Sequence, residues 1–166
     1  QNLVTGVTPF DRMEYTRPDM DAFDAQLQQL CDLAATEKDF DKLIDEIWAF
    51  YGTYDAFTTA SALASIHYYA DMSSSYWAAE HRFCTDHAAR ADAALDTLYR
   101  ALAKSPLREE LEQPDYFGPG YFVYYEGDGI YDEALMSLLQ QEAALLGRYY
   151  NLCAEAEALE AGSEAY

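Results

Sequence analysis

The sequence is poor in several kinds of residue, and positive charge is the first of them. Its 166 residues include 30 Asp and Glu but only 10 Lys and Arg, which gives a formal net charge of −20. Proteins that bind nucleic-acid phosphates or anionic membrane surfaces need clustered cations, whereas the 10 Lys and Arg are spread along this chain. The charge pattern therefore argues against nucleic acid and membrane as partners.

Cysteine, glycine, proline and long apolar runs are scarce as well. Cys31, Cys84 and Cys153 are odd in number and far apart, a pattern typical of reduced thiols rather than of a disulfide framework. We therefore expect a cytoplasmic protein. No run of about 18 apolar residues occurs, so no transmembrane helix is expected. The 8 Gly and 5 Pro gather in a few places, which favours long uninterrupted helices between them.

Apolar residues are plentiful. Hydrophobic residues make up 51% of the chain and aromatic residues 15%, which is enough for the core of one domain. Acidic disordered tails contain few aromatic residues, so the negative charge does not indicate disorder.

Apolar residues recur at helical spacing along most of the chain. Residues 1–17 lack this period and are predicted to form an extended lead-in. A first helix begins at Pro18-Asp19, and a second follows Asp39 as its cap. Residues 57–69 are apolar nearly all round and are expected to be buried on several sides. After a turn at residues 71–75, a third helix is predicted over 74–104.

The rest of the chain is predicted to be a short helical turn, one irregular insertion and a last helix. Ser105-Pro106 begins the turn, and the aromatic and Gly-rich residues 114–129 form the insertion, for which a short hairpin is expected. The last helix spans about 131–158. We therefore expect an all-α fold, a bundle of long antiparallel helices with one short non-helical insertion. The expected domain is 18–158, with residues 159–166 as a frayed tail.

Two groups of residues resemble metal ligands by type. His81, Cys84 and His87 lie at steps of three on one helix and suit zinc by chemistry, but no fourth ligand is near, and a buried Cys beside two helical His is favoured. The acids form two sets without the Gly-centred alternation of a calcium loop, and solvated helix faces explain them. These acids are Asp39, Asp41, Asp45 and Glu46, and Glu109, Glu110 and Glu112.

Two further features have competing interpretations. Gly127-Asp128-Gly129 lacks the Lys-Ser or Lys-Thr of a phosphate loop and is interpreted as a turn. The preceding aromatic run 121–125 is expected to pack on the bundle rather than to form a ligand platform. Glu142 interrupts an otherwise apolar seam on the last helix, and a buried carboxylate needs a partner. We expect a salt bridge to an Arg, or a contact with another domain or a ligand, and we expect the seam to abut the bundle core or a missing domain.

Motifs for catalysis are absent from the sequence. It contains no His-Glu-x-x-His, Gly-x-Ser-x-Gly or Cys-x-x-Cys. We therefore assign no catalytic, cofactor-binding or metal-binding residue to this chain.

Four segments, in order, resemble the N-terminal region of oligoendopeptidase F-like enzymes, relatives of thimet oligopeptidase. Residues 10–19, with Tyr15, Arg17, Pro18 and Asp19, resemble that family's Tyr-x-Arg-Pro-Asp start. Residues 66–80 resemble its central segment, which ends in Glu80. The other two segments are residues 98–112 and residues 138–154, the latter with Glu142, Tyr150 and Leu152.

The resemblance implies the helical wall or lid domain of a zinc metallopeptidase that cleaves short peptides. Zinc would be held by a His-Glu-x-x-His motif and a later Glu in a C-terminal catalytic domain, which would be the partner of this chain. The chain itself would bind no zinc and would be inactive alone. The alternatives are a stand-alone acidic helical interaction module and an independent metal-binding bundle. An acidic wall beside the channel would favour basic peptides, although solubility alone also explains the charge.

Overall fold

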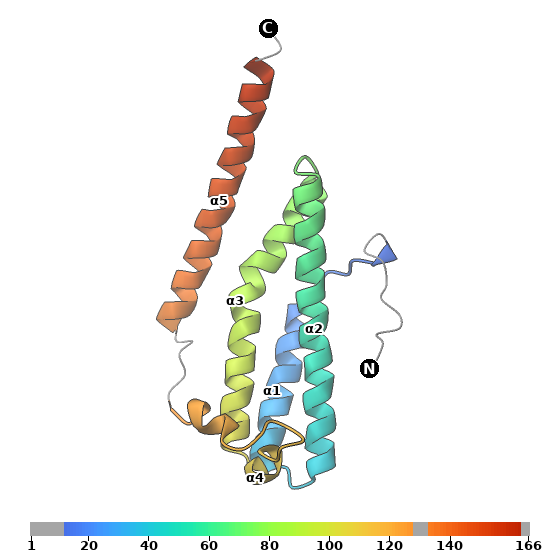
Figure 1. The fold of residues 1–166 in the computed structure, drawn as a ribbon, viewed down its shortest axis with the longest axis vertical. Coiled ribbons are helices and arrows are strands. Elements are labelled where there is room, and N and C mark those ends of the chain that lie inside the picture. Colours follow the sequence, from blue (N-terminus) through green and yellow to red (C-terminus); the bar gives the residue numbers. More distant parts are fainter. Residues whose placement is uncertain (1–11, 128–132, 164–166) are drawn as a thin grey trace.

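The computed structural model describes residues 12–127 and 133–163. Its elements are α1 (Met20–Thr36), α2 (Phe40–Ala70), α3 (Ser75–Ala103), α4 (Arg108–Leu111), the 3-10 helix η2 (Tyr121–Tyr125) and α5 (Glu133–Ser163). Successive long helices run in opposite directions, with α4 and η2 at the base of the bundle (Figure 1). The described residues contain no strand, and the predicted all-α class is confirmed.

The predicted helix starts agree with the observed caps. Asp19 accepts hydrogen bonds from the backbone N–H groups of Asp21 and Ala22, and Asp39 accepts one from Lys42. At the start of α3, the Ser74 hydroxyl oxygen accepts a hydrogen bond from the backbone N–H of Trp77. Short polar side chains at these positions satisfy N–H groups that have no partner within the helix, so these three helices begin at or next to the predicted residues.

The core lies at the base, where α1, α2 and α3 meet α4 and η2. Phe23 and Phe50 pack at 5.3 Å between ring centroids, and Leu98 of α3 is fully buried in the same cluster. The short elements close the base, because Leu111 of α4 and Phe122 of η2 are also fully buried. Burial of large apolar side chains is a major favourable contribution to folding, so this cluster is the main packed core of the described residues.

Residues 114–127 form turns and the 3-10 helix η2 rather than the expected hairpin. Gly118 and Gly120 have φ values of 90° and 73°, a left-handed conformation that strains other residues. Each carbonyl then accepts a hydrogen bond from the N–H three residues ahead, Tyr121 and Val123 respectively. The insertion thus coils under the bundle, and Asp128 and Gly129 lie outside the described residues. The turn at Ser105-Pro106 is present, but α4 begins later, at Arg108.

One prediction about burial is wrong, and one of two alternatives for the last helix is excluded. Within 57–69 only one stripe is buried, and Ile66 and Tyr69 are about half exposed, because the upper part of α2 packs mainly on α3. The apolar residues Leu138 and Leu145, on either side of Glu142 on α5, are also exposed, so this face does not abut the bundle core. The last helix also differs in extent, since it continues to Ser163 rather than ending near 158. The Ala- and Glu-rich composition of that segment favours helix.

Candidate functional site

The three candidate zinc ligands do not come together. His81 Nδ1 lies 3.2 Å from Ser65 Oγ, whose own proton is donated to the carbonyl of Ser61. His87 Nδ1 lies 2.8 Å from the carbonyl of Phe83, to which it donates, and Cys84 is fully buried. Burial raises the pKa of the Cys84 thiol and lowers the pKa of His81. Within the described part of the chain, no three His, Cys, Asp or Glu side chains are placed to hold a metal ion.

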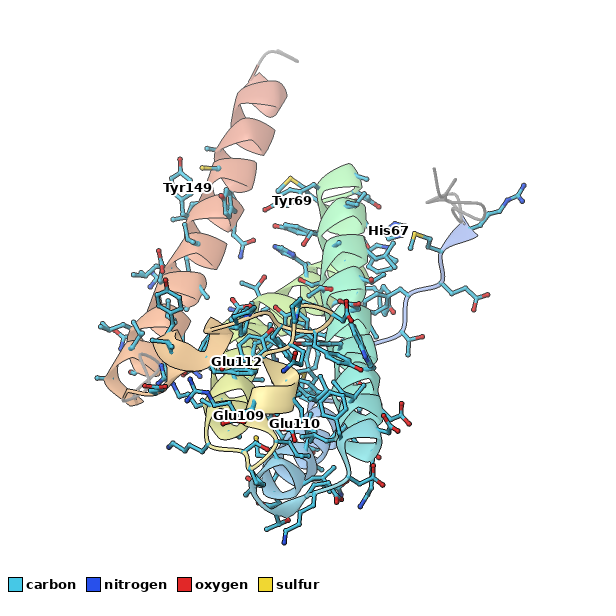
Figure 2. All side chains as sticks on the ribbon, turned by 60° about the horizontal axis from the view of Figure 1, so that its bottom comes forward. His67, Tyr69, Glu109, Glu110, Glu112 and Tyr149 are labelled. Carbon is cyan, nitrogen blue, oxygen red and sulfur yellow. The ribbon has the colours of Figure 1, made fainter. Side chains whose placement is uncertain are left out.

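The acidic candidates have structural contacts or lie in solvent. Asp39 caps α2, while Asp41, Asp45 and Glu46 are exposed on that helix. Glu109, Glu110 and Glu112 lie on and just after α4 (Figure 2), and the first two are exposed. Glu112 accepts a hydrogen bond from the backbone N–H of Phe122 at 3.1 Å and so holds η2 against α4.

The Gly127 region is held by an arginine rather than arranged around a ligand. Arg100 donates to the Gly127 carbonyl at 2.5 Å and pairs with Asp96 on its own helix. In the aromatic run, Tyr121 and Tyr125 pack around Tyr99 of α3. Another member, Tyr124, is 87% exposed. The expected packing on the bundle is therefore present for only part of the run.

Glu142 is exposed on α5, and the structure gives it no ion pair or hydrogen bond among the described residues. The predicted salt bridge to an Arg is therefore absent there. The flanking seam residues Leu138 and Leu145 are 61% and 62% exposed. The prediction that this seam abuts the bundle core is wrong, and the prediction that it meets another domain stays a prediction.

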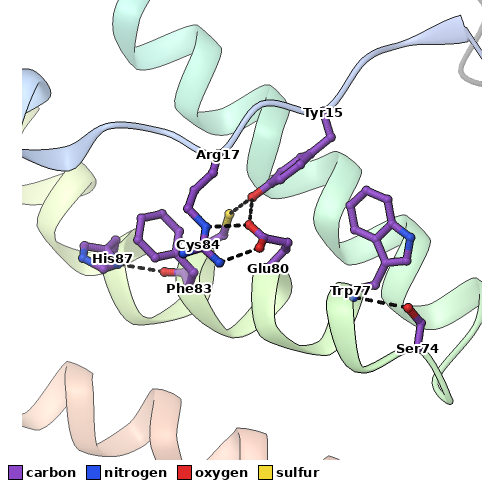
Figure 3. A network of polar contacts seen from close by, with 8 residues as sticks. All are labelled: Tyr15, Arg17, Ser74, Trp77, Glu80, Phe83, Cys84 and His87. Atoms are coloured by element: carbon purple, nitrogen blue, oxygen red, sulfur yellow. Dashed lines mark hydrogen bonds and ion pairs between the residues drawn. The ribbon is translucent and has the colours of Figure 1, made fainter.

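A buried carboxylate on α3 forms the most developed polar site. Glu80 is 4% exposed and accepts two hydrogen bonds from Arg17, from Nε at 2.8 Å and from Nη2 at 2.5 Å. The Tyr15 hydroxyl donates to the same carboxylate at 2.7 Å. Two residues of the non-helical lead-in are therefore joined to the first half of α3 (Figure 3).

The charges of this site depend on one another. The two hydrogen bonds from Arg17 hold the pKa of Glu80 below its ordinary value, and the same contact raises the pKa of Arg17. Burial, followed by donation to Glu80, raises the pKa of the Tyr15 phenol. The pair therefore remains ionised at neutral pH, while Tyr15 keeps its proton. This site stabilises the fold, because the Glu80 carboxylate already accepts hydrogen bonds from Tyr15 and Arg17.

Aromatic side chains surround this network. The Arg17 guanidinium lies over the Phe83 ring at 4.8 Å from its centroid, a favourable cation–π geometry. Tyr15 meets Trp77 edge to face, and Trp77 stacks on His67 of α2 at 4.1 Å. His67 and Tyr69 lie on the upper part of α2 (Figure 2). The lead-in is therefore fastened across the upper half of the α2–α3 hairpin.

A groove of about 930 Å³ lies between α3 and α5, with residues of the upper part of α2 in its wall. Its volume is that of a small-molecule or short-peptide site. Aromatic rings and two arginines contribute to its walls, together with small residues of α5. The lining includes Arg17, Tyr68, Tyr69, His81, Arg82, Phe83, Asp86, Ala143, Gly147, Tyr150 and Asn151.

The sequence does not single out the Glu80 network as a site, although its members belong to two of the segments that resemble a known family. Arg17 and Glu80 are 63 residues apart, so a periodic sequence pattern does not predict that they pair. The available signal was a Glu on the same helix face as the buried Cys84, four residues before it.

The fold and this site define a helical domain in which a buried carboxylate, Glu80, pairs with the half-exposed Arg17 and secures the lead-in. The sequence matches the Peptidase M3 N-terminal domain family over residues 10–127. This match covers more than half of the chain, which therefore belongs to that family, and it includes all three residues of the Glu80 network. Neither the comparison with curated proteins nor that with solved structures found a match. No helix in the described ranges is long and apolar enough to cross a membrane.

Proposed function

We propose that this chain is the N-terminal helical domain of a cytoplasmic zinc oligopeptidase and forms one wall of the channel that admits short peptides. The family match over residues 10–127 carries this proposal. A helical wall restricts entry to flexible peptides and excludes folded proteins by size. A wall that hinges over the substrate would also exclude water during hydrolysis.

The groove between α3 and α5 supports this role. Its rings from Tyr68, Tyr69 and Phe83 offer apolar contact, while Arg82 and Asn151 offer hydrogen-bond donors. A peptide carries apolar side chains along a backbone rich in carbonyl acceptors, so this mixture suits it. The network of Tyr15, Arg17 and Glu80 would hold the lead-in and one edge of the groove in place while peptides enter and leave.

Hydrolysis itself would come from a catalytic domain that follows this one. Peptidase zinc sites require closely spaced His and carboxylate ligands, and this sequence contains no His-Glu-x-x-His. Its residues therefore do not fit a zinc site, and no step of hydrolysis is assigned to them. The chain alone should bind no zinc and cleave nothing. The net charge of −20 would favour basic peptides through long-range attraction.

The test compares this chain with the product of its complete reading frame. Both are incubated with internally quenched peptides of graded length, with and without a zinc chelator, and zinc is measured after dialysis. The expected result is chelator-sensitive cleavage of short peptides by the complete product only. Cleavage by the isolated chain would contradict the proposal. Stoichiometric zinc on the isolated chain would instead favour an independent metal-binding bundle.

The second candidate is a stand-alone acidic helical interaction module, favoured by the exposed apolar face of α5. The reading frame separates the two candidates. A downstream His-Glu-x-x-His supports the peptidase, whereas a stop soon after residue 166 supports the module. A preference for basic over acidic peptides at low ionic strength would further support the acidic wall, and equal turnover would remove that part of the proposal.

A further inference from the structure

Helix α5 carries a row of leucines that nothing in the described structure covers. Leu138, Leu145 and Leu152 are spaced by seven residues and are 61%, 62% and 60% exposed. Tyr149, also 60% exposed, lies in the same seam. We call these four residues the α5 seam. Single exposed leucines are ordinary on protein surfaces, but several large apolar side chains aligned on one helix face indicate a contact with another surface.

The opposite side of α5 is already occupied. Ala143, Gly147, Tyr150 and Asn151 face the groove towards α3, and Tyr68 donates a hydrogen bond to Asn151 at 3.4 Å. Tyr149 lies on the side of α5 that points away from Tyr69 of α2 (Figure 2). The helix is therefore apolar on two sides, one used within the chain and one facing outward.

The spacing of the α5 seam indicates the shape of its partner. Leucines every seven residues, with a second row four residues after each, form the side of a helix that pairs with another helix in a left-handed coiled coil. In this register Glu142 stands four residues after Leu138, in the same row as Tyr149. A carboxylate inside such an interface needs a cation opposite it.

A second copy of this chain does not supply that cation. In a parallel pair, Glu142 would face its own counterpart, and the two carboxylates would repel each other. In an antiparallel pair in register, Glu142 would face a leucine. Each copy also carries a net charge of −20, so two copies repel over longer distances. This charge pattern favours a different helix that carries a basic residue over a second copy of the chain.

We infer that the α5 seam docks an amphipathic helix of the peptidase's catalytic domain, with a Lys or Arg side chain of that helix opposite Glu142. This inference rests on the proposed function and adds the face and the charge pattern of the contact. Docking at the seam would fix α5, and with it the groove wall formed by Ala143 and Gly147, relative to the catalytic domain.

The test uses the same substitutions in two proteins, the 166-residue chain and the complete product of its reading frame. Leu145→Asp places a charge in the seam, and Gln140→Asp places one on an exposed position of α5 outside it. In the complete enzyme, Leu145→Asp should lower the unfolding midpoint by more than about 5 °C, whereas Gln140→Asp should leave it unchanged. In the isolated chain both variants should unfold at the wild-type temperature.

Glu142→Leu tests the predicted charge pairing. In the complete enzyme it should lower the midpoint, because the opposing cation loses its partner. In the isolated chain it should promote dimers, because it completes the apolar seam, and light scattering should detect them where the wild type is monomeric. A wild-type dimer that Leu145→Asp dissociates would show that a second copy covers the seam and would overturn the inference.

Equal midpoints for all variants in the complete enzyme would also overturn the inference while leaving the proposed function intact. A reading frame without a zinc-peptidase domain would overturn both. Should Leu145→Asp prevent folding of the complete enzyme, Glu142→Gln provides a milder change, which should lower the midpoint there and leave the isolated chain unaffected. The absence of that difference would count against the basic partner.

Discussion

The base of the bundle and helix α5 use similar residues in opposite ways. At the base, Leu98 of α3 is fully buried among side chains from α1, α2 and η2. On α5, Leu145 is 62% exposed, although it belongs to an equally regular apolar row. Figure 1 shows the base enclosed by several helices, while α5 stands at one side of the bundle, beside α3 and in contact with Tyr68 and Tyr69 of α2. A helical pattern therefore establishes that a face is apolar, and the number of neighbouring helices decides whether that face is buried.

The difference separates what this chain needs to fold from what it offers to a partner. The base contains most of the fully buried large side chains on which folding of this chain depends. The α5 seam contributes little to the stability of the isolated chain, because its side chains remain in water in both the folded and the unfolded state.

The largest expected effect comes from one substitution made in both regions. Leu98→Ala should lower the free energy of unfolding by about 2–5 kcal/mol, because it leaves a cavity in a packed core. Leu145→Ala should change it by less than about 0.5 kcal/mol, because the side chain is exposed and Ala favours helix. Urea unfolding followed by circular dichroism measures both values. Similar losses for the two variants would erase the distinction between the regions.

A second comparison concerns two ion pairs. Glu80→Ala should lower the free energy of unfolding by about 1–3 kcal/mol, since it removes three hydrogen bonds to a buried carboxylate. Arg90→Ala breaks the exposed pair with Asp24 and should cost less than about 0.5 kcal/mol. Chemical unfolding of both variants tests this order, which a larger loss for Arg90→Ala would reverse.

Two glycines should respond in opposite directions to alanine. Gly120→Ala should cost about 1 kcal/mol, because φ is 73° at that position. Gly52→Ala should stabilise α2 by about 0.5–1 kcal/mol, because Gly52 is exposed within a helix and an added Cβ meets nothing within 4 Å. Thermal unfolding measures both, and a destabilising Gly52→Ala would argue against a regular helix there.

The smallest expected effect is a pH dependence confined to acid conditions. The pKa of Glu80 is lower in the folded chain than its ordinary value, which is about 4.3 when unfolded. The Glu80 carboxylate therefore stabilises the fold fully above about pH 5, and this contribution is lost as the pH falls through the folded pKa. The stability difference between wild type and Glu80→Gln should be constant from about pH 5 to 7 and shrink below. A difference that stays constant in acid would contradict the ionised pair.

The helices are predicted well because their signals are local. Asp39 and Ser74 identify helix starts through hydrogen bonds that span a few residues, and the apolar period identifies the buried face of α1. The turn at 71–75 is likewise predicted from its polar residues. The family resemblance rests on short segments for the same reason, and the family match over residues 10–127 confirms it.

The errors concern contacts between distant residues. Arg17 and Glu80 pair across 63 residues of sequence, so no local sequence pattern predicts this contact. The upper part of α2 is apolar on several sides, yet Ile66 and Tyr69 remain about half exposed, although His81 of α3 and Tyr150 of α5 contact the Tyr69 ring. The hairpin expected in the insertion is wrong because the carbonyls of Gly118 and Gly120 accept hydrogen bonds from N–H groups three residues ahead and so form successive turns rather than a strand pair. The residue types in the insertion alone do not distinguish a hairpin from consecutive tight turns.

Amide hydrogen exchange on the isolated chain tests the division between the two regions most directly. Amides of the lower half of α2 and α3 should exchange only through global unfolding, and those of α5 should exchange much faster through local opening. In the complete enzyme the α5 amides should become as protected as those of α2. Equal protection of α5 and α2 in the isolated chain would contradict the conclusion that the α5 seam has no partner within the described residues.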